Sequence, residues 1–199
     1  LEGGSIESDG KGTILTTSQC LLAPHRNQPM EKEDIEKCLL KMLHAKRVLW
    51  LDYGNLIGDD TDGHVDTVAR IAPNDTIVYM QCRDENDEQY TDLLEMEKQI
   101  LALRTADGVP YRTLALPSPS PIFDEDGERL PATYANFLVI NGAVLYPTYA
   151  QPENDRIAAK VLKEAFPTHE IVGIDCRALI KQHGSLHCVT MQYPEWKKY

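Results

Sequence analysis

Two short polar segments contain residues that could carry out chemistry on a small substrate. One holds His64 and Asp66, two positions apart, and the other holds the adjacent residues His187 and Cys188. An imidazole that titrates near neutral pH can act as a general acid and base, and a nearby carboxylate can bind a cation. A thiol becomes a strong nucleophile once a base or a positive neighbour has removed its proton. Together these residue types indicate nucleophilic catalysis with proton transfer.

The spacing of His64 and Asp66 predicts how they are oriented. If this segment is extended, as its β-branched neighbours suggest, side chains at i and i+2 point to the same face. The alternative is a solvated acidic loop in which the aspartates cap a turn. An EF-hand loop is excluded, because its register would place Gly58 at the first ligand position and Ala69 where the bidentate glutamate belongs.

Cys188 has a histidine next to it in the chain, but adjacent side chains of a strand face opposite ways. We therefore expect a distant histidine, brought close by the fold, to serve this thiol. A buried structural cysteine is the commoner role for an isolated thiol and remains an alternative. Zinc binding by Cys176, His183, His187 and Cys188 is less favoured, because these spacings match no standard structural zinc site.

Composition narrows the class of protein. The 199 residues are 42% hydrophobic, enough for one domain or a piece of a larger one. The net charge of −11 argues against nucleic acid or an anionic membrane as the main partner and favours a cationic substrate. No apolar run approaches the roughly 18 residues of a membrane span. Five scattered cysteines without a C-x-x-C pair favour a reducing compartment, the cytoplasm.

The elements that position these residues recur in one order: strand, strand, helix, strand. The predicted strands lie at residues 5–8, 13–17 and 47–51, then 65–72, 76–80 and 111–116, then 134–140, 143–146 and 170–174. The predicted helices lie at residues 34–43, 90–103 and 155–165, and a fourth unit begins with a strand at 186–191. A period of about 60 residues predicts an array of units that pack around a shared axis or along a line.

The polar residues occupy related places in this array. Glu2, His64, Asn136 and Cys188 each lie near the start of the first strand of a unit. In a closed rotational array, equivalent positions meet at the centre, so these four side chains are expected to converge. The proline-rich segment 114–131 interrupts the pattern and predicts a long loop, either a connector or a segment that gates the substrate.

With these segments in view, and with Glu2-Gly3-Gly4-Ser5 and Tyr134-Ala135-Asn136-Phe137 in register with them, the sequence resembles the agmatine deiminases. This family belongs to the guanidino-group-modifying superfamily. The resemblance implies an α+β fold, the pentein propeller of strand-strand-helix-strand units around a pseudo-fivefold axis. It covers essentially the whole chain, with about three and a half of the five repeats. Residues 1–199 are therefore expected to form the C-terminal portion of a single pentein catalytic domain whose N-terminal repeats are absent.

The resemblance also implies a role for each candidate residue. Cys188 matches the nucleophile, His64 the general acid and base, and Glu2 and Asp66 the carboxylates that hold a guanidinium, while Asn136 lines the pocket. The implied reaction hydrolyses agmatine to N-carbamoylputrescine and ammonia, in polyamine biosynthesis, through a covalent thiouronium intermediate on Cys188. It uses no metal and no organic cofactor.

Two other functions remain open, and the chain departs from the family in two places. Peptidylarginine deiminases of the bacterial type share these motifs, and a propeller that only binds ligands is an alternative of another class. A single glycine, Gly184, stands where the family usually carries a Gly-rich turn. A further substrate-binding aspartate upstream has no counterpart, so activity is expected to need the upstream segment of the same protein. Association into a homo-oligomer is also left open.

Overall fold

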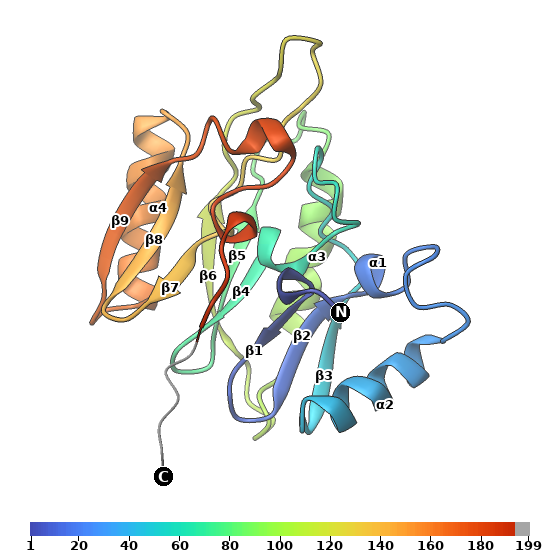
Figure 1. Cartoon of the computed structure of the whole chain (residues 1–199). Coiled ribbons are helices and arrows are strands. Elements are labelled where there is room, and N and C mark those ends of the chain that lie inside the picture. Colours follow the sequence, from blue (N-terminus) through green and yellow to red (C-terminus); the bar gives the residue numbers. More distant parts are fainter. Residues whose placement is uncertain (194–199) are drawn as a thin grey trace.

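The computed structural model describes residues 1–193 and contains three three-stranded sheets (Figure 1). In each sheet the middle strand pairs antiparallel with the strand before it and parallel with the strand after it. A helix connects the two parallel strands in every unit, as a parallel connection requires. The predicted strand-strand-helix-strand order is therefore confirmed in three units.

The elements have the following bounds. The first unit contains β1 (Ile6–Ser8), β2 (Thr13–Thr17), α1 (Ser18–Leu21), α2 (Lys32–Met42) and β3 (Arg47–Leu51). The second contains β4 (Ala69–Ala72), β5 (Thr76–Gln81), α3 (Tyr90–Ala102) and β6 (Arg112–Pro117). The third contains β7 (Leu138–Ile140), β8 (Ala143–Thr148), α4 (Pro152–Ala165) and β9 (Glu170–Asp175). Four 3₁₀ helices are η1 (Gly3–Ser5), η2 (Val65–Thr67), η3 (Ile180–Gln182) and η4 (His187–Val189).

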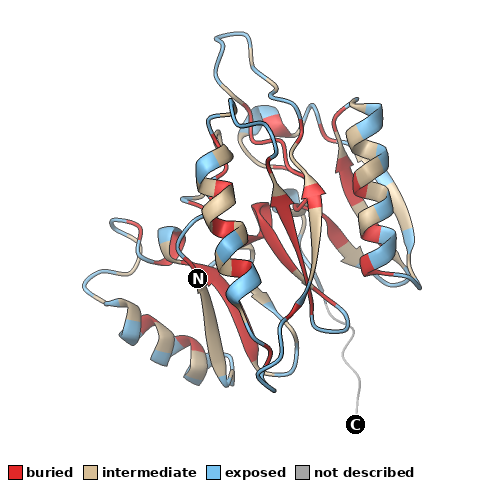
Figure 2. Ribbon diagram, turned by 180° about the vertical axis from the view of Figure 1, so that it is seen from behind, coloured by how far each residue is buried: buried red, intermediate tan, exposed pale blue. Residues whose placement is uncertain are grey.

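The helices form where apolar residues recur at helical spacing, and they lie against the sheets by that face. In α3 the buried residues are Leu93, Met96 and Ile100, three and four positions apart, which places them on one side of the helix. Figure 2 shows buried residues on the sheets and along the helix faces turned toward them. No helix in the part of the chain that the structure describes is both long and apolar enough to cross a lipid bilayer.

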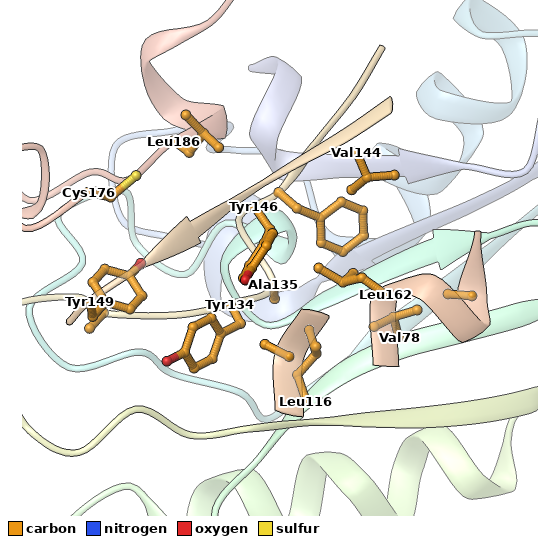
Figure 3. Close-up of a cluster of buried hydrophobic side chains, with 14 of the residues drawn as sticks. Val78, Leu116, Tyr134, Ala135, Val144, Tyr146, Tyr149, Leu162, Cys176 and Leu186 are labelled. Atoms are coloured by element: carbon orange, nitrogen blue, oxygen red, sulfur yellow. The ribbon is translucent and has the colours of Figure 1, made fainter. Parts of the chain in front are cut away.

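The second and third units share an apolar core, part of which is drawn in Figure 3. Tyr134 is fully buried there, its ring packs edge-on against Tyr149 at a centroid distance of 5.5 Å, and its hydroxyl donates to Asp155 Oδ1 at 2.6 Å. Phe137 is also buried in this core. The packing of Tyr134 and Phe137 fixes the short segment between them, which carries Asn136.

The first strand of every unit begins later than predicted, because a turn precedes it. The strands expected from residues 5, 65 and 134 begin at Ile6, Ala69 and Leu138, and segment 186–191 forms η4 and a coil instead of a strand. Hydroxyl groups explain three of these turns. Ser5, Thr67 and Thr190 each donate through the side chain to the carbonyl three residues earlier, at 2.7 Å. Such local bonds compete with strand pairing.

The segment between the second and third units is also shorter than predicted. β6 continues to Pro117, so residues 114–117 belong to a strand and not to the loop. The remaining loop includes an isolated bridge between Phe123 and Arg129, and Arg129 forms a buried ion pair with Asp87 at 2.8 Å. None of its described residues lines the central cavity, so the structure provides no support for a gating role.

Candidate active site

The turns that begin the units meet around one cavity of about 490 Å³. Its wall is formed by Glu2, Gly3, Gly4, Thr61, His64, Asp66, His187, Cys188, Thr190, Met191 and Gln192. The cavity therefore brings together four of the five predicted side chains. The fifth, Asn136, is fully buried and lies behind the wall instead of lining it as expected.

His64 is placed by a tight turn and not by a strand. Asp59 Oδ2 accepts hydrogen bonds from Thr61 Oγ1 at 2.5 Å and from the Gly63 amide at 3.1 Å. Asp62 and Gly63 adopt left-handed backbone conformations, with φ of 61° and 86°, which suits glycine and is tolerated by aspartate. Burial raises the pKa of Asp59 above its ordinary value. The extended conformation predicted here is thus wrong, although His64 and Asp66 still face one cavity.

Glu2 and His64 form the first of two carboxylate-imidazole pairs. His64 Nε2 donates to Glu2 Oε2 at 2.7 Å. The Arg26 guanidinium contacts the same oxygen. The hydrogen bond from His64, together with that from Arg26, lowers the pKa of Glu2 below its ordinary value. With Nε2 bonded to Glu2, Nδ1 is the nitrogen of His64 that remains for proton transfer.

Asp66 and His187 form the second pair. His187 Nδ1 donates to Asp66 Oδ2 at 2.6 Å, and Asn136 Nδ2 donates to the same oxygen at 3.1 Å. The Asp66 side chain is 1% exposed, and no donor within the described residues reaches its Oδ1. A buried acceptor without a partner is costly. This oxygen is therefore well suited to a ligand that carries N–H donors.

Gly4 separates the two pairs and leaves room for them. A Cβ atom at this position would lie 2.6 Å from His64 Nδ1 and 2.9 Å from Asp66 Oδ2. Both contacts are shorter than real Cβ atoms allow. The absence of a side chain at Gly4 thus keeps the free imidazole nitrogen and the carboxylate accessible from the same point.

Cys188 is held by the amide of Asn136. Asn136 Oδ1 accepts from the backbone amides of His187 at 2.8 Å and Cys188 at 3.3 Å, and the Cys188 Sγ lies 3.4 Å away. Cys188 is exposed as a residue, whereas its thiol faces groups that displace water. This partial burial, followed by the charge of Asp66, raises the pKa of the Cys188 thiol above its ordinary value.

Two site residues were not identified from the sequence in these roles. His187 was considered as a partner for the thiol and as a zinc ligand, but it bonds to Asp66. A signal existed, because Glu2, His64 and His187 all stand three residues before a Ser or Thr that bonds back to them. Arg26 lies in a loop without periodicity, so no sequence pattern connected it with Glu2.

Metal binding finds little support in these side chains. Ligand atoms of Glu2, Cys20 and His64 lie within 4.8 Å of one another. However, burial raises the pKa of the Cys20 thiol to about 11, which disfavours the thiolate that a metal needs. Arg26 already places a positive charge on Glu2. The four-residue zinc set considered from the sequence is not among the metal-binding clusters of the described residues.

Comparison with known proteins identifies the family of this chain. The Porphyromonas-type peptidyl-arginine deiminase family matches residues 1–194. A candidate agmatine deiminase of Marinomonas sp. (strain MWYL1) is 38% identical, over 98% of this chain and 57% of that protein. The structure of a candidate arginine deiminase from Porphyromonas gingivalis is 53% identical with a TM-score of 0.95, over 98% of this chain and 57% of that one. The C. jejuni agmatine deiminase, solved as a cysteine-to-serine variant with substrate bound, is 43% identical with a TM-score of 0.88, over 94% and 54%.

The chain spans 57–58% of the length of the curated relatives it matches. Its fold matches the two solved structures over 98% and 94% of the chain. The expected α+β pentein fold is thereby confirmed. The matching sequence model, the shared fold and the polar residues around one cavity lead to one conclusion: the chain belongs to the Porphyromonas-type peptidyl-arginine deiminase family.

Proposed function

We propose that the protein containing this chain hydrolyses the guanidinium of agmatine to N-carbamoylputrescine and ammonia. The observation that carries the proposal is the arrangement of the cavity. Two carboxylates, Glu2 and Asp66, each bonded to an imidazole, face the same space as the Cys188 thiol. A guanidinium is planar and carries N–H donors on every nitrogen, so two fixed carboxylates can orient it.

Binding the cation prepares the nucleophile. At rest the thiol is protonated, because its pKa is raised by burial and then by Asp66. A bound guanidinium adds a positive charge that favours the thiolate. Cys188 Sγ then attacks the guanidinium carbon, and the thiol proton passes to His64. Holding both reacting groups in one cavity makes this step unimolecular.

His64 serves both halves of the reaction. It gives its proton to the departing nitrogen as the C–N bond breaks, so ammonia leaves and a thiouronium remains on Cys188. Water then attacks the same carbon and loses a proton to His64. The C–S bond breaks, which releases the ureido product and restores the thiol. The free Nδ1 of His64, next to Gly4, is the atom suited to these transfers.

Two substrate classes need to be separated, and the relatives point both ways. The matching family is described as peptidyl-arginine deiminase, whereas the Marinomonas and C. jejuni relatives are described as agmatine deiminases. We favour agmatine as the substrate. The test compares ammonia release from agmatine with ureido formation in an arginine-containing peptide. Turnover of the peptide but not of agmatine would identify peptidyl-arginine, and not agmatine, as the substrate.

A propeller that only binds ligands is the alternative of another class. Agmatine binding and ammonia release, measured for the wild-type protein and for a Cys188→Ala variant, distinguish this binding module from an enzyme. An enzyme of the proposed kind loses all turnover in this variant but still binds agmatine. Agmatine binding with equal affinity and no turnover in either protein would instead favour the binding module.

The activity is proposed for the whole protein, because the chain spans 57–58% of its relatives. We propose that residues 1–199 work as part of a single larger pentein domain. Assays should therefore use a protein of the relatives' length, with the 199-residue chain for comparison. A cytoplasmic location is supported by the five cysteines, which are all free.

A further inference from the structure

Arg26 lies in the loop between α1 and α2, outside the segments that form the cavity. Its guanidinium makes three contacts with two of those segments. One nitrogen contacts Glu2 Oε2, and the other donates to the Thr61 carbonyl at 2.9 Å and to Asp62 Oδ2 at 3.2 Å. Arg26 therefore connects the turn that carries Glu2 with the turn that carries His64.

A guanidinium on Glu2 could either compete with the substrate or support the site. The contacts favour support. Arg26 does not line the cavity, and it binds Oε2, the oxygen that already accepts from His64. Within residues 1–193 no donor contacts the other oxygen of Glu2, Oε1. The substrate and Arg26 can thus use different oxygens of one carboxylate.

We propose that Arg26 is a positioning residue that holds Glu2 in one orientation, so that Oε1 is presented to a guanidinium substrate. The substrate class rests on the proposed function, whereas the effect on Glu2 does not. Arg26 would do for the Glu2–His64 pair what Asn136 does for the Asp66–His187 pair. Asn136 donates to Asp66 at 3.1 Å from behind the cavity wall.

The loop that carries Arg26 is itself fixed. The Arg26 amide donates to the Ala23 carbonyl at 3.2 Å. The side chain of Asn27 donates to the carbonyl of Leu21, the last residue of α1, at 2.8 Å, and that of Gln28 donates to the Ala23 carbonyl at 2.9 Å. A guanidinium offers donors in a rigid fork, which suits simultaneous contact with a carboxylate and a carbonyl. A lysine would preserve the charge but not this geometry.

Glu2 is 55% exposed at its side chain, so it needs partners to hold one rotamer. The charged and titratable groups that face it are Arg26 and His64, with Asp62 bound to Arg26 on one side and the buried Cys20 beneath. Among them Arg26 is a permanent cation. Its removal would leave a single hydrogen-bond partner and would raise the pKa of Glu2 toward its ordinary value of 4.5.

The experiment compares three arginine variants of the whole protein in a Cys188→Ser background, which prevents turnover. Arg26→Gln removes the cation, Arg26→Lys preserves it, and Arg129→Gln is the matched control. Arg129 is a shielded arginine in an ion pair with Asp87, outside the cavity. Agmatine affinity is measured by calorimetry, the pKa of Glu2 by carboxyl ¹³C titration, and folding by thermal melting.

We expect Arg26→Gln to weaken agmatine binding roughly 10- to 100-fold, the range for a lost hydrogen bond to a charged group. It should also raise the pKa of Glu2. Arg26→Lys should restore the pKa more fully than the affinity. Arg129→Gln should lower the melting temperature and leave both the affinity and the Glu2 titration unchanged.

Two results would overturn the proposal. One is an unchanged Glu2 titration and affinity in folded Arg26→Gln, and the other is tighter agmatine binding, which would make Arg26 a competitor of the substrate. Failure of the proposed function has a different signature. In that case the wild-type protein neither binds nor hydrolyses agmatine or an arginyl peptide, while the Glu2 titration still reports whether Arg26 acts on this carboxylate.

Discussion

At the scale of single residues, the site combines a protonated thiol with anionic neighbours. The raised pKa of Cys188 means that its thiol is uncharged at rest, and a bound cation would favour the thiolate. Selective activation has a physical benefit, because an uncharged thiol reacts slowly with oxidants and other electrophiles. In the proposed reaction, the carboxylates would bind the substrate and restrain the nucleophile at the same time.

This restraint can be measured by alkylation. Cys188 and Cys38 are exposed and the other three cysteines are buried, so Cys38→Ser leaves one accessible thiol. Because the folded-state pKa of Cys188 lies above the ordinary 9.0, the iodoacetamide rate should still rise with pH beyond that value. Agmatine should protect Cys188 from modification. Mass spectrometry of each cysteine gives the rates, and a rate already constant below about pH 8 would indicate an acidified thiol instead.

Asp66 allows a second prediction at this scale. Asp66→Asn preserves size but removes the negative charge that faces the cavity. Truncating one partner of a desolvated charge pair costs about 2–5 kcal/mol, or roughly 30-fold to several thousand-fold in affinity. We expect a loss of that order in agmatine affinity, measured by calorimetry, together with slower turnover. Unchanged kinetics in this variant would assign Asp66 a structural role only.

At the scale of elements, the turns determine where the chemistry lies. Hydrophobic periodicity predicted the three longer helices and the central strands closely, because burial decides those elements, but it missed the four-residue α1. It could not predict the turns, since the hydroxyl-to-carbonyl bonds of Ser5, Thr67 and Thr190 leave no periodic signal. The position of His187 was missed for that reason. On a strand it would face away from Cys188, whereas in η4 both residues line the cavity.

A substitution at Gly4 tests whether the turn that carries Glu2 positions the site. Gly4→Ala would place a methyl group 2.6 Å from His64 Nδ1 and 2.9 Å from Asp66 Oδ2, so one of them must move. A displacement near 1 Å in an active site can cost about 100-fold in rate, and we expect kcat/KM to fall by that order. The comparison variant is Gly3→Ala. Gly3 also lines the cavity, but its Cβ meets nothing within 4 Å, so His64 and Asp66 should stay in place and the loss should be smaller. Equal losses in both variants would contradict this explanation.

At the scale of the whole molecule, the repeat predicted that distant residues would converge, and it did so without any local motif. Glu2 and His64 are 62 positions apart and form a hydrogen bond, and Asp66 and His187 are 121 positions apart and form another. The repeat could not predict which side chains hold the units in register. Such contacts form between side chains that come together only when the units pack, and Arg70 is the principal example.

Arg70, in β4, links β1 with the segment that leads into β7. Its side chain is 7% exposed, Nε donates to Glu7 of β1 at 2.6 Å, and Nη1 donates to the carbonyls of Ala135 and Phe137 on either side of Asn136. The guanidinium also lies over the Phe137 ring, 4.6 Å from its centroid. Glu7 in turn accepts from the Ile71 amide at 2.9 Å. One guanidinium therefore connects the first two sheets with the segment before the third, on both sides of the residue that contacts Cys188.

We expect Arg70→Met to destabilise the protein by about 3–5 kcal/mol, the cost of leaving one partner of a buried ion pair without the other. Urea unfolding measures this loss, and agmatine turnover should fall with it because Asn136 loses its flanking contacts. The control is Arg156→Met, which removes an exposed pair with Glu153 and should barely move the urea midpoint.

Adding Glu7→Met to Arg70→Met should recover stability but not turnover, since it removes the unpaired charge without restoring the contacts to the Ala135 and Phe137 carbonyls. If Arg70→Met and Arg156→Met were equally stable, the three sheets would be held in register by apolar packing alone.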